Sequence, residues 1–178
     1  MTDFATRDSI GYVSTVELRI VRAAYARSNL VQVLAIVINR LGTLWLYPIL
    51  LLVCFALEGT KIAPVLLAAC LSVGTAHCIY PTLKKRLARP RPYQIDPTLK
   101  PRIQALDEYS LPSGHVMTLT ATLIPVVVAF PYFLSVSVVL WAAIAWARIA
   151  LAHHYPSDVA AGGALAAVIS VPVSVIIL

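Results

Sequence analysis

The feature that most constrains the fold is a series of long apolar stretches without charged residues. Ile62–Leu83 and Val159–Leu178 are each long enough to cross the hydrocarbon core of a bilayer, which takes about 20 helical residues. The whole chain is 60% hydrophobic and only 12% charged, whereas soluble domains usually carry about 25% charged residues. So few polar side chains cannot cover a water-facing surface. The composition therefore excludes an ordinary soluble domain and a disordered chain.

The apolar stretches predict an all-α, multi-pass transmembrane helical bundle of about five spans: Leu41–Leu57, Ile62–Leu83, Val116–Phe130, Phe133–Ala152 and Val159–Leu178. Residues 13–38 mix apolar residues with Glu17 and three arginines, which are costly inside lipid. We interpret this segment as an interfacial amphipathic helix that lies on the membrane. The alternative is a distorted sixth span. We expect residues 1–40 to form an N-terminal tail and this helix, and residues 41–178 to form the transmembrane domain.

The order of the spans brings the polar segments to one side of the membrane. The basic loop 84–115 lies between two predicted spans. Because the chain leaves that side through Val116–Phe130 and returns through Phe133–Ala152, Arg148 and the segment His153–Asp158 come back to the side of the loop.

Three polar clusters on this side fit phosphate chemistry: the basic run Lys84–Pro92, the helix start Pro112–His115, and the trio Arg148, His154 and Asp158. Fixed cations stabilise the oxygens of a transferring phosphoryl group. A helix start offers free N–H groups to an anion, and a glycine there lets the oxyanion approach closely. Of two histidines, one can attack phosphorus while the other protonates the leaving oxygen, and a carboxylate can orient one imidazole.

These residues form three sequence motifs: Lys-x6-Arg-Pro ending at Pro92, Pro-Ser-Gly-His ending at His115, and Arg-x5-His-x3-Asp ending at Asp158. Together, and in this order, they resemble the signature of type-2 phosphatidic acid phosphatases. Lipid phosphate phosphatases and vanadium haloperoxidases share that signature. The resemblance covers residues 84–158, and the membrane spans favour its lipid phosphatase branch.

The resemblance implies a role for each matching residue. His154 would be the nucleophile that forms a phosphohistidine, Asp158 would orient it, and His115 would protonate the leaving alkoxide. The phosphate would be held by Lys84, Arg91, Ser113, Gly114 and Arg148. No metal or other cofactor is implied. The chain departs from the family at Ala147, where a serine is common, so one hydrogen bond to phosphate is expected to be missing.

Other polar residues are interpreted as structural. We expect His153 to be a rim or packing residue and His77 a hydrogen-bonded interior residue. The three cysteines match neither a metal site nor a disulfide framework. Headgroup contacts or solvated charges are expected of Arg86, Arg89, Lys100 and Arg102.

Three functions compete. The favoured one is an integral membrane phosphatase that acts on phosphatidate, phosphatidylglycerol phosphate, or a polyprenyl phosphate or diphosphate. The second is a non-catalytic phospholipid-binding or lipid-translocating protein, although pure binding does not need two histidines and a carboxylate. The third is a metal-dependent hydrolase or metal carrier that uses His115, His154 and Asp158, but three basic residues in the same pocket would repel a cation. No nucleic-acid motif is present.

The net charge of +6 bears on orientation. Apart from Lys84, Arg91 and Arg148, ten lysines and arginines fall on the predicted site side, and only Lys61 falls on the other. The positive-inside rule then places the site on the cytoplasmic face of the cell membrane. Many bacterial members of the family face outward instead. The sequence leaves the lipid substrate and the oligomeric state open.

Overall fold

The structure is a computed structural model that describes residues 14–178, and every regular element in that range is helical. The elements are α2 (Thr15–Ala24), α3 (Asn29–Arg40), the π-helical turn η1 (Leu41–Trp45), α4 (Leu46–Glu58), the 3₁₀ turn η2 (Gly59–Lys61), α5 (Ile62–Leu87), α6 (Pro92–Ile95), α7 (Gly114–Ala129), the 3₁₀ turn η3 (Pro131–Phe133), α8 (Leu134–Ala150) and α9 (Pro156–Ile177). The predicted tail before residue 14 lies outside the described residues.

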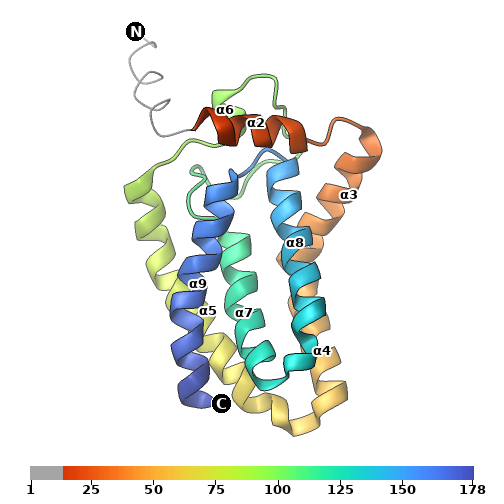
Figure 1. Cartoon of the computed structure of the whole chain (residues 1–178), viewed down its shortest axis with the longest axis vertical. Helices are drawn as coiled ribbons and strands as arrows, with labels where there is room; N and C mark the ends of the chain where they lie inside the picture. Colours follow the sequence, from red (N-terminus) through yellow and green to blue (C-terminus); the bar gives the residue numbers. More distant parts are fainter. Residues whose placement is uncertain (1–13) are drawn as a thin grey trace.

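The long helices run up and down along one axis (Figure 1). α3, η1 and α4 follow one another down one side, and α5 returns along the other. α7 occupies the centre and packs against α5, α8 and α9. The all-helical bundle that the apolar stretches predict is therefore present, although the first of its long segments begins at Asn29 rather than at Leu41.

Helix α2 lies across one end of the bundle rather than along it (Figure 1). Ser14 caps its start by accepting a hydrogen bond from Val16 N, and the chain bends by 106° before the next helix. The amphipathic character expected for residues 13–38 thus belongs to α2, while the apolar part of that segment joins the bundle as α3. The two helices do not form one straight span.

The surface of the bundle suits a lipid environment. Large apolar side chains stand exposed on the outside, with Ile176 at 83%, Leu52 at 67% and Val168 at 74% of their full accessibility. By length and hydropathy, three helical stretches of the described chain qualify as membrane spans, or four if the bent pair α2–α3 counts as one. Helix α7 is apolar but shorter. The protein is a membrane protein, and the predicted number of five spans stays a prediction.

The chain reversals explain why the polar segments that carry the predicted site meet at one end. α5 ends where Ala88 adopts the left-handed conformation, and α8 ends just before Ala152, which does the same. Pro156 then opens α9 at a position where its missing N–H is harmless. As a result α2, α6, the segment 96–113 and the α8–α9 turn lie together at the end opposite the C-terminus (Figure 1).

Candidate active site

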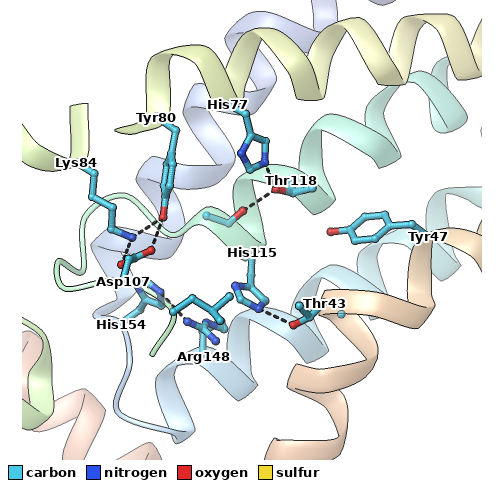
Figure 2. A pocket seen from close by; sticks show the side chains of 13 residues that line it. Thr43, Tyr47, His77, Tyr80, Lys84, Asp107, His115, Thr118, Arg148 and His154 are labelled. Atoms are coloured by element: carbon cyan, nitrogen blue, oxygen red, sulfur yellow. Dashed lines mark hydrogen bonds and ion pairs between the residues drawn. The ribbon is translucent and has the colours of Figure 1, made fainter. Parts of the chain in front are cut away.

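A cavity of about 310 Å³ opens between α5, α7, α8 and η1 at this polar end (Figure 2). Of the residues predicted for the site, Lys84, Gly114, His115, Arg148 and His154 line it. Arg91, Ser113 and Asp158 are buried directly behind these residues rather than at the cavity wall. The structure thus brings the three sequence motifs together in one place.

The cation Lys84 meets a carboxylate that the sequence did not single out. Its Nζ lies 2.7 Å from Asp107 Oδ1 and donates a 2.5 Å hydrogen bond to the Tyr80 hydroxyl, which in turn donates to Asp107 Oδ2. Arg91 reaches the same carboxylate at 2.5 Å. Asp107 therefore occupies the cation cluster that is predicted to hold phosphate (Figure 2).

The cations around Asp107 also control its ionisation. Burial alone would raise the pKa of Asp107, but the hydrogen bond and charge of Lys84, with the charge of Arg91, hold it below its ordinary value. Asp107 is thus an anion at neutral pH. Its side chain retains 39% of its accessibility, so it faces the opening rather than the interior.

Arg148 is almost fully buried, at 3% accessibility, and joins two helices to the site. One of its terminal nitrogens donates to Asn39 Oδ1 on α3, and the other lies 3.1 Å from His154 Nε2. A lone arginine in an apolar helix is costly unless it is paired or functional. Here the hydrogen bond to Asn39 orients the Arg148 guanidinium so that its other terminal nitrogen faces the His154 imidazole.

The contacts of His154 determine where its proton sits. Nε2 faces the guanidinium groups of Arg148 at 3.1 Å and Arg91 at 3.5 Å. Because guanidinium groups only donate, Nε2 must be the unprotonated acceptor, and the proton of a neutral ring lies on Nδ1. Nδ1 lies 3.5 Å from Asp158 Oδ2, which is outside hydrogen-bond geometry but close enough to tighten when the ring becomes charged.

The surroundings of His154 also keep the ring neutral. Burial away from water, and then the positive charges of Arg148 and Arg91, lower the pKa of His154 well below its ordinary value. At neutral pH the ring therefore presents an unprotonated Nε2 to the cation cluster, which is the form that a nucleophile requires.

His115, in the first turn of α7, also lines the cavity, and Figure 2 shows it beside Arg148. Its Nε2 lies 2.8 Å from Thr43 Oγ1. The Thr43 hydroxyl gives its single proton to Asn39 O at 2.8 Å, so it must accept from His115 Nε2. His115 therefore carries a proton on Nε2, which it donates to Thr43 Oγ1.

The start of α7, which places Gly114 and His115 on the cavity wall, suits an anion. Ser113, the N-cap residue of α7, makes no side-chain cap hydrogen bond, and its hydroxyl is buried without a partner among the described residues. Free N–H groups and the positive end of the helix dipole favour an anion at such a start. Gly114 fits here because a Cβ would lie 2.7 Å from the Tyr80 hydroxyl.

Two sequence-based expectations are wrong. His77 is hydrogen-bonded as expected, to Thr118 Oγ1 at 2.9 Å, but it is exposed and lines the cavity rather than the interior. Arg89 is neither a headgroup contact nor a solvated charge, because it is 5% accessible and pairs at 2.6 Å with both Asp158 and Glu17. His153 is a packing residue as expected, buried and 3.0 Å from Ile103 O. Ala147 lies in a buried apolar cluster with Ala26 and does not line the cavity, so the position that departs from the family pattern is not at the cavity wall.

Sequence reasoning missed several polar residues at or beside the cavity, among them Asn39, Thr43, Tyr80 and Asp107. The first two were detectable as a polar pair four residues apart in an apolar stretch, next to the π-helical turn that carries Thr43. Tyr80 precedes Lys84 by one helical turn and thus shares its face. For Asp107 no sequence signal existed, because its position depends on how the segment between α6 and α7 folds back.

Within the described residues, no group of three or more His, Cys, Asp or Glu side chains lies close enough to hold a metal ion. The charged side chains that line the cavity include the cations Lys84 and Arg148. The donor set therefore suits an anion.

Comparison with known proteins places the chain in a family. Residues 65–177, more than half of the chain, match the family model of the PAP2 superfamily. The protein belongs to the PAP2 superfamily. A search among curated proteins gave no match.

Two solved structures share the fold of this PAP2 protein. The first is a transmembrane PAP2-type phosphatidylglycerolphosphate phosphatase from Bacillus subtilis, with a TM-score of 0.70, 21% identity, and coverage of 94% of this chain and 89% of the other. The second is LpxE from Aquifex aeolicus, with a TM-score of 0.63, 22% identity, and coverage of 90% and 95%. At these identities the likeness concerns the fold.

Proposed function

We propose that this PAP2 protein is a metal-independent phosphatase that hydrolyses a lipid phosphate or diphosphate through a phosphohistidine on His154. The observation that carries the proposal is that the unprotonated Nε2 of His154 lies between Arg148 and Arg91. Those two cations can hold the phosphate oxygens against the attacking nitrogen. Membership of the PAP2 superfamily supports the same chemistry.

In the first step His154 Nε2 attacks phosphorus while the bond from phosphorus to the lipid oxygen breaks. His115 enters this step with both ring nitrogens protonated, gives one proton to the leaving oxygen and becomes neutral, so the lipid departs as an alcohol. The ring of His154 becomes cationic as the N–P bond forms, and Asp158 holds the Nδ1 proton. In the second step water attacks phosphorus, His115 takes a proton from it, and the N–P bond breaks to release inorganic phosphate. Both histidines then return to their starting states.

An apolar cavity supports a lipid as the substrate. It has a volume of about 630 Å³, lies between α4, α5 and α7, and shares Tyr47 and Thr118 with the polar cavity. Its remaining lining is almost entirely apolar, including Leu50 and Val65. A lipid whose phosphate is held at His154 would thus have an apolar cavity beside the phosphate for its hydrocarbon chain. Candidate substrates are phosphatidate, phosphatidylglycerol phosphate, and polyprenyl phosphate or diphosphate.

The proposal is tested by phosphate release from these lipids in mixed micelles with purified protein. His154→Ala is expected to abolish turnover and to form no acid-labile phosphoenzyme. His153→Gln should still form that phosphoenzyme, because a glutamine amide can still donate to Ile103 O. Turnover that survives in His154→Ala refutes the mechanism. Turnover lost on adding a chelator and restored by a divalent cation refutes metal independence. Lipid binding without any turnover favours the non-catalytic alternative.

For the orientation we propose a cytoplasmic site in the cell membrane. The basis is the clustering of positive residues at the site end, with Lys61 at the opposite end in η2. Lys100 is exposed near the site and Lys61 is exposed at the far end, so cysteines at these two positions form a matched pair. In intact cells an impermeant maleimide should label only the cysteine at position 61, in a background without native cysteines. Labelling only at position 100 refutes the proposal.

A further inference from the structure

A row of charges connects the crossing helix α2 to the back of the site. Glu17 Oε2 on α2 lies 2.6 Å from Arg89 NH2, and Arg89 NH1 lies 2.6 Å from Asp158 Oδ1. Asp158 Oδ2 in turn is the oxygen next to His154 Nδ1. We infer that Glu17 and Arg89 are positioning residues for the reaction, which fix Asp158 in place and set the net charge that His154 meets. The inference rests on the proposed function of His154 and names two residues outside its motifs.

The row is built to hold one geometry. Arg89 is 5% accessible and stacks on the Tyr155 ring, with its guanidinium carbon 4.1 Å from the ring centroid. Its NH1 also donates to Ser157 Oγ at 2.6 Å, while Glu17 Oε1 accepts from Ser157 N at 3.0 Å. Glu17 and Arg89 therefore clamp the first turn of α9, which carries Asp158.

Both oxygens of Asp158 are fixed by donors. Oδ1 accepts from Arg89 and Oδ2 accepts from Tyr155 N at 2.8 Å. With two different donors on its two oxygens, the carboxylate cannot rotate without losing a charge-assisted hydrogen bond in a fully buried site. Oδ2 thus stays beside His154 Nδ1. Loss of Arg89 would free this rotation and leave a buried carboxylate unpaired.

The charge of Glu17 gives the row its sign. Within the pair Arg89–Asp158, the positive charge of Arg89 partly offsets the stabilisation that Asp158 gives to a cationic ring. Glu17 adds a second negative charge, so the three groups together carry a net charge of −1. As the N–P bond forms on Nε2, the ring becomes positive and this net charge stabilises it. Glu17 therefore contributes to the reaction although it lies on α2 and does not touch the substrate.

A second ion pair on α2 provides a matched control. Arg22 Nε lies 2.5 Å from Asp96 Oδ2 and joins α2 to the segment that follows α6. This pair anchors the same helix but makes no contact with Asp158 among the described ion pairs. Arg22→Gln thus disturbs the docking of α2 without changing the charge behind His154, whereas Glu17→Gln changes that charge.

The test compares the kinetics of Glu17→Gln, Glu17→Asp and Arg22→Gln with those of the wild type in the same micelles. Glu17→Gln is expected to lower kcat about tenfold or more, the size of effect seen for other orienting partners, and to leave KM within about twofold. Glu17→Asp keeps the charge and should recover part of the loss. Arg22→Gln should stay close to the wild type in kcat. An unchanged kcat in Glu17→Gln, or an equal loss in Arg22→Gln, overturns the inference.

The proposed phosphatase function can fail independently of the link between Glu17 and Asp158. A wild-type protein that releases phosphate from none of the lipids refutes that function. The link between Glu17 and Asp158 is then decided by the unfolding midpoints of Glu17→Gln, Asp158→Asn and the double variant. Non-additive shifts support a coupled row, and additive shifts overturn it.

Discussion

The contact between α9 and the start of α7 gives the sharpest test of the site geometry. A Cβ on Gly162 would lie 2.5 Å from the backbone oxygen of Ser113. Because backbone cannot rotate away as a side chain can, the segment Pro112–His115 must move by about 0.5 Å or more to accept Gly162→Ala. That segment holds His115 and the open start of α7. The substitution therefore shifts the site without changing any residue in it.

The neighbouring glycine separates this effect from helix propensity. Both glycines lie inside α9, where alanine is favoured by about 1 kcal/mol per residue. A Cβ on Gly163 would lie 3.5 Å from the Trp141 ring, an ordinary contact. Gly163→Ala is thus expected to be neutral or to raise the unfolding midpoint. Gly162→Ala should lose about 1–3 kcal/mol to overpacking, offset in part by the same propensity gain.

The effect on turnover should exceed the effect on stability. A displacement of about 1 Å in a catalytic group can cost on the order of 100-fold in rate, so a shift of half that size is expected to cost roughly tenfold in kcat/KM. The assay is phosphate release from lipid micelles at a temperature where both variants are folded by circular dichroism. If Gly162→Ala keeps the wild-type rate, or if Gly163→Ala loses as much, the close approach of α9 to Ser113 does not constrain the site.

Three further outcomes are expected. Asp107→Asn should tighten inhibition by vanadate about threefold to tenfold, because the carboxylate no longer competes for Lys84 and Arg91. The same variant should have a lower unfolding midpoint, because both ion pairs are lost. Weaker inhibition by vanadate contradicts this prediction. Burial, and then the charge of Arg148, lower the pKa of His153 to about 3, so only the unfolded chain gains a proton as the pH falls below about 6.5. Between pH 7 and pH 5 the wild type should therefore lose about 2 kcal/mol more stability than His153→Gln, and equal losses contradict it. Lys84→Ala should raise KM for the lipid phosphate at least tenfold, because Lys84 lines the cavity. Lys85→Ala is the control, since Lys85 is exposed and does not line the cavity, and its KM should stay unchanged. Equal effects of the two variants on KM would refute a specific role for Lys84.

The helical bundle could be predicted because its cause is local. Charge-free runs of sufficient length permit only a helix in lipid, since every backbone group must be satisfied within the segment. Segment boundaries were harder to predict. α3 begins at Asn29 because Ser28 caps it there, and it passes into α4 through η1 without a break, so the charged Arg40 lies inside a helical run and not at its edge. Charge alone does not mark where a helix ends.

The site could be predicted only as far as its motifs reach. Lys84, His115, Arg148 and His154 meet because span order returns them to one end, which the sequence encodes directly. The partners that orient them come from segments with no fixed spacing to the motifs. Arg89 was misassigned because its sequence neighbours are basic and exposed, whereas its partner Glu17 lies on another helix far away in the chain. A charge is recognised as buried only when the opposing element is known.

The position of Asp107 follows from the same electrostatics that suit the site to phosphate. Lys84, Arg91 and Arg148 are all buried at the same end of the bundle, where their mutual repulsion is poorly screened. The Asp107 carboxylate pairs with the first two and reduces that repulsion. A phosphate group brings more negative charge and more acceptor oxygens than one carboxylate, so it can displace Asp107 toward the opening where that side chain is already part exposed. Under the proposed function, the residue that stabilises the cation cluster before substrate binds is therefore the one that opposes binding, and we expect its removal to change stability and anion affinity in opposite directions.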